Sequence, residues 1–148
     1  MSSYKIFETH AHYDDEAFDE DRDVLLGSMD ENGIQEVVNV CASIDSLEKT
    51  KALMEKYSFV YGAFGIHPDD AELVTEEVLD KVRECCGLEK AVAVGEIGLD
   101  YYWHKEAGEH ELQKKVFRQQ MEIARELHMP FMVHSREAAA DTLHLAQD

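Results

Sequence analysis

The amino-acid sequence predicts an α/β fold in which helices cover a parallel sheet. Five short apolar segments rich in β-forming residues recur along the chain, and a stretch with helical spacing of apolar residues separates each from the next. Strict alternation of buried strands with helices favours parallel pairing, because each helix carries the chain back to the start of the next strand. No internal linker, repeat or low-complexity segment interrupts the 148 residues, so we expect one domain.

The predicted strands are short runs bounded by polar or turn-forming residues. They cover residues 5–7, 36–42, 59–65, 91–97 and 131–133. Between the first two strands, Leu25 and Met29 fit a helix that ends at Asn32-Gly33. A last helix begins at Glu137. A doubly wound sheet and a (β/α)8 barrel both show this alternation, so the pattern alone leaves the two architectures open.

Three further helices are predicted, and each has one apolar face. The second helix is expected to begin at a cap formed by Asp45 or Ser46, and its apolar face comprises Leu47, Thr50, Leu53 and Tyr57. The third helix stops at Gly87, and its apolar face comprises Val74, Val78, Val82 and Cys85. The fourth helix covers residues 109–128 and ends before Pro130, and its apolar face comprises Phe117, Met121, Ala124 and Leu127.

Composition and charge exclude several classes of protein. The formal net charge of −18 argues against a nucleic-acid binder that relies on a basic surface, although it leaves room for phosphate chemistry inside a metal-filled cleft. No apolar stretch approaches the roughly 20 residues that span a membrane, and the first residues resemble no signal peptide. We therefore expect a cytoplasmic protein with no membrane partner. The three cysteines show no CxxC spacing, and Cys85 and Cys86, adjacent on a predicted helix, are expected to pack as small hydrophobic residues.

Polar residues follow the carboxyl ends of four of the predicted strands. These segments are Thr9-His10-Ala11-His12, Gly65-Ile66-His67-Pro68, the run 95–100, and His134-Ser135-Arg136. In a parallel α/β fold, the carboxyl ends of the strands form one rim, which is where active sites lie. Five candidate metal ligands are therefore expected to converge there: His10, His12, His67, Glu96 and His134.

The candidate ligands have the chemistry of a site for divalent ions. His10 and His12 point to the same side of a strand, so they can bind one ion together. Imidazole and carboxylate ligands suit Zn²⁺, Mn²⁺, Fe²⁺ or Ni²⁺, whereas Mg²⁺ prefers more oxygen. Glu96 comes from another strand and can bridge two ions about 3.5–4 Å apart. A single histidine or glutamate would be an ordinary packing or surface residue, and the convergence of several at successive strand ends favours the metal site.

The ordered segments Thr9-His10-Ala11-His12, Gly65-Ile66-His67-Pro68, Gly95-Glu96-Ile97-Gly98-Leu99-Asp100-Tyr101-Tyr102 and His134-Ser135-Arg136 resemble the signature motifs of the TatD family. The helix between the last two segments also matches, at Gln113, Phe117, Gln120 and Ala124. The resemblance covers the whole chain. It implies a TIM-like (β/α) barrel, of which this chain supplies about the first four to five βα units. It also implies a divalent-metal-dependent hydrolase that cleaves phosphodiesters with a metal-activated water, typically a deoxyribonuclease.

Carried over by position, the resemblance implies that Glu96 is the catalytic carboxylate and bridges two divalent ions (Zn, Mn, Mg, Fe or Ni). The other implied ligands are His10 and His12 for one ion and His134 for the second. The residues implied to form the substrate-binding rim are His67, Asp100, Tyr101 and Arg136, with His67 and Arg136 in contact with phosphate. Glu8 stands where the family usually has Asp, and we expect little consequence.

A second departure from the family concerns ligands that come later in its sequence. The family has a further ligand histidine in an H-x-F-S-G-like segment and an aspartate ligand near the last strand, and neither motif occurs here. A complete barrel also needs about 250 residues. We therefore expect residues 1–148 to be the N-terminal part of a single TatD-type barrel, a truncated product with weak or no activity. Its exposed sheet edges are expected to pair with another chain in a homodimer, or to leave the chain unstable alone.

Two other functions remain open at this point. One is a metal-dependent amide or ester hydrolase, such as an aminoacyl-tRNA deacylase, because one barrel supports many chemistries. The other is a non-catalytic metal-binding fragment, which the missing ligands favour for this chain. The leading prediction is a two-metal hydrolase with nucleic acid as its substrate.

Overall fold

The computed structural model of the protein describes residues 5–147. It contains one five-stranded parallel sheet, and its strands are β1 Ile6–Ala11, β2 Ile34–Val40, β3 Val60–Phe64, β4 Ala91–Asp100 and β5 Phe131–Arg136. The α-helices are α1 Arg22–Gly27, α2 Ile44–Lys56, α3 Glu76–Cys86, α4 Ala107–Glu126 and α5 Ala139–Gln147. Two short 3-10 helices, η1 Glu16–Phe18 and η2 Pro68–Leu73, follow β1 and β3. The predicted α/β alternation is confirmed.

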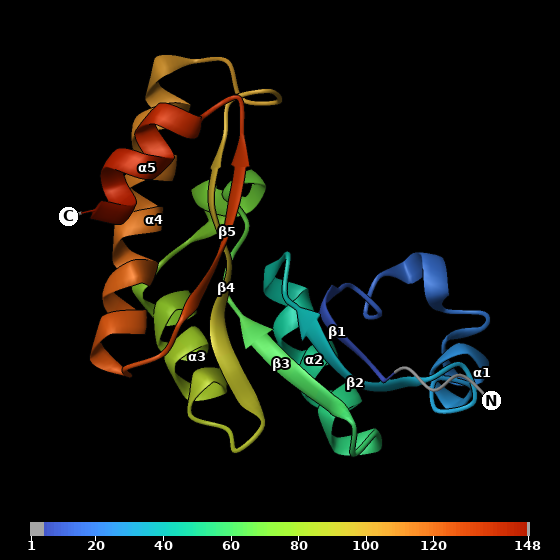
Figure 1. The fold of residues 1–148 in the computed structure, drawn as a ribbon. Helices are drawn as coiled ribbons and strands as arrows, with labels where there is room; N and C mark the ends of the chain where they lie inside the picture. Colours follow the sequence, from blue (N-terminus) through green and yellow to red (C-terminus); the bar gives the residue numbers. More distant parts are fainter. Residues whose placement is uncertain (1–4, 148) are drawn as a thin grey trace.

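The order of strands in the sheet decides between the two architectures that the sequence left open. The order is β1-β2-β3-β4-β5, so every strand lies beside its neighbours in sequence. A doubly wound sheet would reverse direction at a switch point, whereas a barrel adds each strand on the same side of the last. The five strands form a curled half-barrel with helices outside it, and α4 and α5 lie side by side against the end formed by β4 and β5 (Figure 1). The TIM-like prediction is confirmed for these units.

Two helix boundaries differ from the predicted ones for reasons of local chemistry. The helix after β1 ends at Gly27, so Met29 lies in a turn, and the chain reaches β2 through Gly33 at a φ of +80°. The cap of α2 is Ser43 and not Asp45 or Ser46, because the Ser43 hydroxyl accepts a hydrogen bond from the Ser46 backbone N–H at 3.2 Å. The two predicted caps therefore lie inside the first turn.

The helix α3 begins later than the spacing of its apolar residues predicted. Its cap is Thr75, whose hydroxyl accepts a hydrogen bond from the Val78 backbone N–H at 3.3 Å. Val74 precedes this cap and packs against the core from outside the helix. The end of the helix at Gly87 is as predicted.

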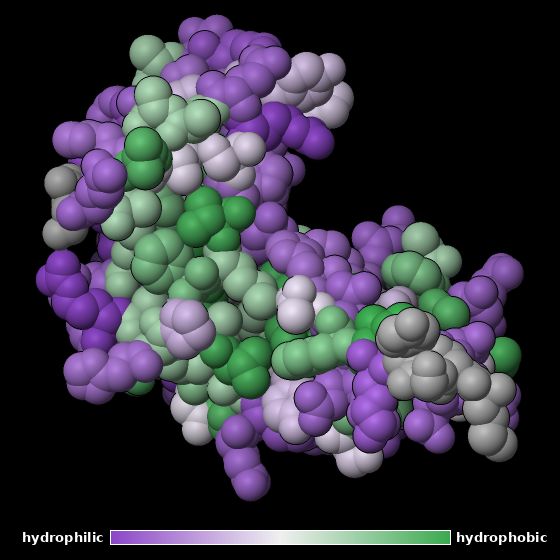
Figure 2. All heavy atoms as spheres, in the orientation of Figure 1, coloured by the Kyte–Doolittle hydropathy of each residue, from purple (hydrophilic) through white to green (hydrophobic). Residues whose placement is uncertain are grey.

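The main hydrophobic core fills the space between the sheet and the helices. Its largest fully buried members include Phe64, Ile97, Leu47, Leu26, Phe117 and Ile123. A smaller cluster on the opposite face of the sheet consists of Val38, Val40, Ala63 and Ala93. Figure 2 shows apolar side chains gathered over β4 and β5 and continuing as a band toward β1. Apolar side chains along the edge of the sheet at β5 are therefore partly open to solvent.

Two buried glutamines of α4 fix the ends of β3 and β4. The side-chain amide of Gln120 accepts a hydrogen bond from the Ile66 backbone N–H at 2.8 Å and donates to the Ile66 carbonyl at 3.0 Å. Gln113 makes the same pair of bonds with the backbone of Asp100, at 2.9 and 3.2 Å. Each amide satisfies both backbone groups of one residue, as a neighbouring strand would otherwise do. The backbone at the carboxyl ends of β3 and β4 is therefore held in place by α4.

The three cysteines are buried. Burial raises the pKa of both Cys41 and Cys86 to about 12. The interpretation of Cys85 and Cys86 as packing residues is confirmed, since both belong to the main core. Within residues 5–147, none of the helices has the length and apolar character needed to cross a bilayer.

Candidate metal centre

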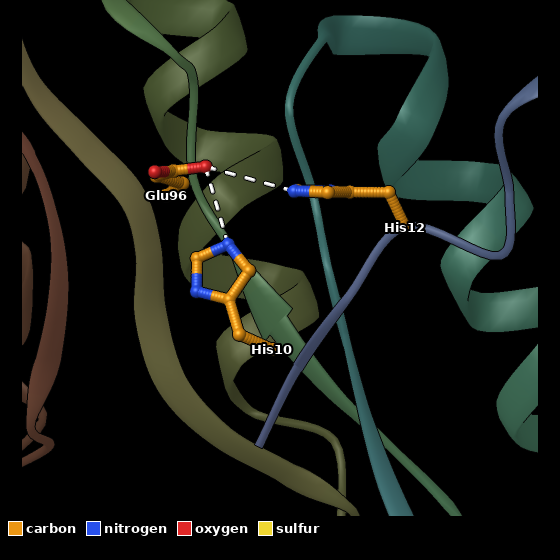
Figure 3. A group of neighbouring side chains, drawn as sticks. All are labelled: His10, His12 and Glu96. Atoms are coloured by element: carbon orange, nitrogen blue, oxygen red, sulfur yellow. Dashed lines mark ion pairs between the residues drawn. The ribbon is translucent and has the colours of Figure 1, made fainter. Parts of the chain in front are cut away.

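The carboxylate of Glu96 lies at the centre of a cluster that joins three strands. Its Oε2 atom is 3.4 Å from Nε2 of His10, on β1, and 3.8 Å from Nε2 of His12, which directly follows β1 (Figure 3). Its Oε1 atom is 3.3 Å from Nδ1 of His134 on β5. In a flat sheet, β1 and β4 would lie about 14 Å apart, since neighbouring strands are spaced by about 4.8 Å. The curvature of the half-barrel therefore creates the cluster.

His12 is oriented by a backbone group of the neighbouring strand. Its Nδ1 atom is 2.7 Å from the carbonyl oxygen of Val40 at the end of β2. A carbonyl only accepts hydrogen bonds, so Nδ1 carries the proton and Nε2 keeps a free lone pair that faces Glu96. Histidine ligands of metal ions are usually fixed by such a hydrogen bond from the other ring nitrogen. His10 lies beside this ring, with the two ring centroids 5.1 Å apart.

His134 is held between two carboxylates. Its Nε2 atom is 2.9 Å from Oδ2 of Asp100, whose side chain is 1% exposed, and its Nδ1 faces Glu96. The hydrogen bonds to Glu96 and Asp100 outweigh burial and raise the pKa of His134. Burial alone would raise the pKa of Glu96, but the hydrogen bond from His134 and the charge of His10 lower it to about 2. The central carboxylate is therefore ionised across the neutral pH range.

His67 completes a second group of donors around Glu96. Its ring lies edge to face against that of His134, with centroids 4.2 Å apart, and its side chain is 12% exposed. Burial and the charge of His134 lower the pKa of His67. Its Nδ1 atom accepts a hydrogen bond from the backbone N–H of Asp69 at 3.2 Å. The proton of the neutral ring is consequently on Nε2.

The donor set fits divalent metal ions. Within the described residues, two groups place one ligand atom from each member within 4.8 Å of the others: His10, His12 and Glu96, and His67, Glu96 and His134. Two ligands that each lie 2.0–2.2 Å from a tetrahedral ion are roughly 3.3–3.6 Å apart. The separations of Glu96 from its three nearest imidazoles span 3.3 to 3.8 Å, which is close to that spacing. Imidazole nitrogen with carboxylate oxygen suits Zn²⁺, Mn²⁺ or Fe²⁺.

The other residues predicted to form the substrate-binding rim are Asp100, Tyr101 and Arg136, and their side chains take three different directions. The side chain of Asp100 is buried beneath His134 and does not face the open rim. Tyr101 turns toward the helices, where its hydroxyl donates to Asp141 at 2.7 Å and its ring stacks on His110 at 3.7 Å. The structure thus does not bring the Tyr101 side chain to the cluster. Arg136 lies at the end of β5 with its guanidinium 5.5 Å from the centre of an exposed tyrosine ring.

Two groups that contact histidines of the cluster were not predicted from the sequence. The Val40 carbonyl that orients His12 is a backbone atom, which no side-chain pattern can reveal. Asp69 lies two residues after His67 and contacts both His67 Nδ1, at 3.3 Å, and His104 Nε2, at 3.0 Å. The position of Asp69 directly after the His67-Pro68 pair could have indicated its contact with His67. The contact of Asp69 with His104 could not be predicted, because it depends on the loop between β4 and α4.

Comparisons with known proteins identify the family of the chain. The profile of the family described as TatD related DNase matches residues 7–148. The uncharacterized metal-dependent hydrolase YabD of Bacillus subtilis is 35% identical over 97% of this chain and 55% of its own length. A 3'-5' ssDNA/RNA exonuclease TatD of Cronobacter sakazakii is 30% identical over 86% of this chain and 48% of its own length.

A solved structure shows the same fold. The crystal structure of YjjV, a TatD homologue from Escherichia coli, superposes with a TM-score of 0.85 at 27% identity, over 96% of this chain and 55% of that one. The chain spans about half the length of the curated relatives it matches. A family profile that covers nearly all of the chain, a relative at 35% identity and a shared half-barrel establish the assignment, and the chain belongs to the TatD family.

Proposed function

We propose that this chain carries the N-terminal half of a divalent-metal-dependent phosphodiesterase that acts on nucleic acid. One observation carries the proposal: the two oxygens of Glu96 face two different sets of imidazoles. Oε2 faces His10 and His12, and Oε1 faces His134. A carboxylate that serves two donor groups is the arrangement expected of a ligand that bridges two ions.

The proposed roles follow from the donors that each residue offers. His10 and His12 hold one ion through Nε2, His134 holds the other through Nδ1, and Glu96 is the catalytic carboxylate between them. Divalent ions in such a centre lower the pKa of water and offset the negative charge that develops on a phosphoryl group. Asp100 keeps the His134 proton on Nε2, so it acts as a positioning residue.

His67 and Arg136 are proposed to bind the phosphate of the substrate. The hydrogen bond that Nδ1 of His67 accepts leaves Nε2 as a donor, which suits a phosphate oxygen better than a metal ion. The guanidinium of Arg136 pairs with phosphate in a fixed, bidentate geometry. The names of the Cronobacter exonuclease and of the human deoxyribonuclease TATDN3, which is 30% identical to this chain, support nucleic acid as the substrate class.

Metal binding is the first test of the centre. We expect native mass spectra to show bound ions when Mn²⁺ or Zn²⁺ is added to the chain, and His10→Ala to lose at least one of them. His144→Ala, at an exposed position on α5, is the matched control and should bind as the unchanged protein does. Equal ion binding by His10→Ala and the unchanged chain would overturn the proposed centre.

Substrate assays separate the phosphodiesterase from the other two candidate functions. Metal-dependent cleavage of oligonucleotides that is lost in Glu96→Gln supports the phosphodiesterase, whereas cleavage of aminoacyl esters or amides alone would support the other hydrolase. In a purely structural metal site, Glu96→Gln would lower the thermal stability of the loaded protein without any activity to lose. Because the chain spans about half of its relatives, we expect its turnover to be weak.

We also propose that the chain alone forms a homodimer through the exposed edges of its sheet. The exposed apolar residues next to the sheet edges are Ile6 and Phe7 on β1 and Phe131 and Val133 on β5. Edge strands with exposed apolar side chains pair readily with other chains. A second copy offers the same strands in return and would cover both edges.

A further inference from the structure

Two large aromatic side chains are exposed directly after β4, beside the metal centre. Trp103 is 65% exposed and Tyr102 is 44% exposed. Aromatic rings of this size usually bury most of their area, because they dominate the energetics of cores and interfaces. Their rings meet edge to face, with centroids 4.6 Å apart and an angle of 85° between planes. Neither ring is therefore fully covered by the other.

The position of this aromatic pair is fixed by the same carboxylate that orients a metal ligand. Oδ1 of Asp100 accepts hydrogen bonds from the backbone N–H groups of Tyr102, at 2.9 Å, and Trp103, at 3.0 Å. Its other oxygen, Oδ2, contacts Nε2 of His134 at 2.9 Å. The turn that carries the two rings and the histidine of the centre thus share one buried anchor. A ligand on the rings would lie at a set distance from the metals.

Two cations flank the aromatic pair in a protein of strongly negative net charge. Nζ of Lys105 lies 5.1 Å from the centre of the Tyr102 ring, and the guanidinium carbon of Arg136 lies 5.5 Å from it. Lys105 also donates to the Tyr101 carbonyl at 3.1 Å and lies 3.5 Å from a carboxylate oxygen of Glu137. We call Tyr102, Trp103, Lys105 and Arg136 the aromatic platform. Its combination of open rings and cations matches surfaces that bind single-stranded nucleic acid.

We propose that the aromatic platform binds an unpaired base of the nucleic-acid strand by stacking on Trp103, while Lys105 and Arg136 contact the adjacent phosphates. This inference rests on the proposed function and adds to it a subsite for one unpaired base. Stacking requires an unpaired base, because the faces of paired bases are covered by their neighbours in a duplex.

The intrinsic fluorescence of the protein reports directly on this contact, because Trp103 is the only tryptophan of the chain. The full chain is titrated with oligothymidylate of roughly eight nucleotides in EDTA, so that hydrolysis does not occur. We expect quenching of the fluorescence by this strand and little quenching by an abasic strand of equal length. Equal quenching by both strands would reveal a phosphate contact only, and no quenching by either would exclude the platform; both results overturn the proposal.

Variants measured by fluorescence anisotropy of a labelled strand give an independent readout. Trp103→Ala is expected to weaken binding by roughly 5- to 150-fold, whereas Trp103→Phe keeps a stacking ring and most of the affinity. Val24→Ala, at a 77% exposed apolar position on α1, is the control and should leave binding unchanged. Unchanged binding by Trp103→Ala would overturn the proposal.

The outcomes for the platform and for the hydrolase are distinguishable. If oligonucleotides bind in a Trp103-dependent way but no metal-dependent cleavage is found, the proposed function fails and the platform stands. If cleavage occurs with the same KM in Trp103→Ala and in the unchanged chain, the function stands and the platform fails.

Discussion

The buried carboxylate of Asp100 lies against the ring of His134, with Oδ2 and Nε2 2.9 Å apart. Asp100 reaches this position because β4 continues three residues beyond its predicted end at residue 97 and pairs there with β5, residue 100 opposite Arg136. The position of a proton on His134 is thereby determined by a residue that is 1% exposed.

Replacing Asp100 with Asn tests this relationship. The amide oxygen of Asn can still accept the backbone hydrogen bonds from Tyr102 and Trp103, but its NH₂ group would face Nε2 of His134 and favour the wrong tautomer. We expect the affinity for Zn²⁺ or Mn²⁺ to fall by roughly 10- to 100-fold, measured by calorimetry. Asp80→Asn, which changes an exposed ion pair with Arg83, is the control. An unchanged affinity would show that Asp100 does not act through His134.

The close approach of β4 and β5 gives a second prediction. Gly98 has a φ of +150°, and a Cβ built on it would lie 1.9 Å from the carbonyl oxygen of His134. We expect Gly98→Ala to separate the two strands and to destabilise the fold by at least about 1–3 kcal/mol. Gly108→Ala is the matched control, since nothing lies within 4 Å of its added Cβ and Ala favours a helix. Urea denaturation of both variants is the measurement, and equal stabilities would contradict the structure.

Gln120 gives a third prediction, because it satisfies both backbone groups of Ile66. Gln120→Leu would leave a buried N–H and a buried carbonyl without these partners, which costs about 1–3 kcal/mol of unfolding free energy for each group. Gln119→Leu, at the adjacent and partly exposed position, should change the stability by less than about 0.5 kcal/mol. Similar losses in the two variants, measured by thermal or urea unfolding, would refute the role of Gln120.

Features of the fold that depend on interactions between residues close in sequence were predictable, and features that depend on distant residues were not. Strands and helices follow from local patterns of apolar residues, so their order was predictable. The architecture was not, since a doubly wound sheet and a barrel share the same alternation, and only the family motifs pointed to the barrel. Helix ends were misplaced where a serine outside the apolar pattern, Ser43, supplied the cap.

The candidate site divides in the same way. His10 lies on β1 and His12 directly follows that strand, so their common direction was a local property. Their approach to Glu96 depends on the curvature of the sheet between β1 and β4. No local pattern in the sequence encodes that curvature. The direction of Tyr101, which turns to Asp141 on α5, depends equally on helix packing.

The stability of the protein should depend on pH through His104. Burial lowers the pKa of His104, but hydrogen bonds with Asp69 and Glu109 outweigh burial and raise it above the ordinary value. A raised folded-state pKa stabilises the fold fully below the unfolded value of about 6.5, and the contribution is lost as the pH rises through the folded-state pKa. We expect His104→Gln to be less stable than the unchanged chain at about pH 5.5 and equally stable well above the raised pKa. A difference that grows with pH in urea unfolding would have the opposite sign and refute the pairing.

Self-association through the exposed edges of the sheet is the last prediction. Phe7 on the edge strand β1 is 51% exposed, and a lysine at an edge is a common natural barrier to pairing. We expect the chain to be a dimer by light scattering coupled to size exclusion, and Phe7→Lys to shift it toward monomer. Leu143→Lys, at a 61% exposed site on α5 outside the proposed interface, should remain dimeric. A stable monomer with strong metal-dependent turnover would contradict both the dimer and the expected weak activity, because it would show that the half-barrel is sufficient alone.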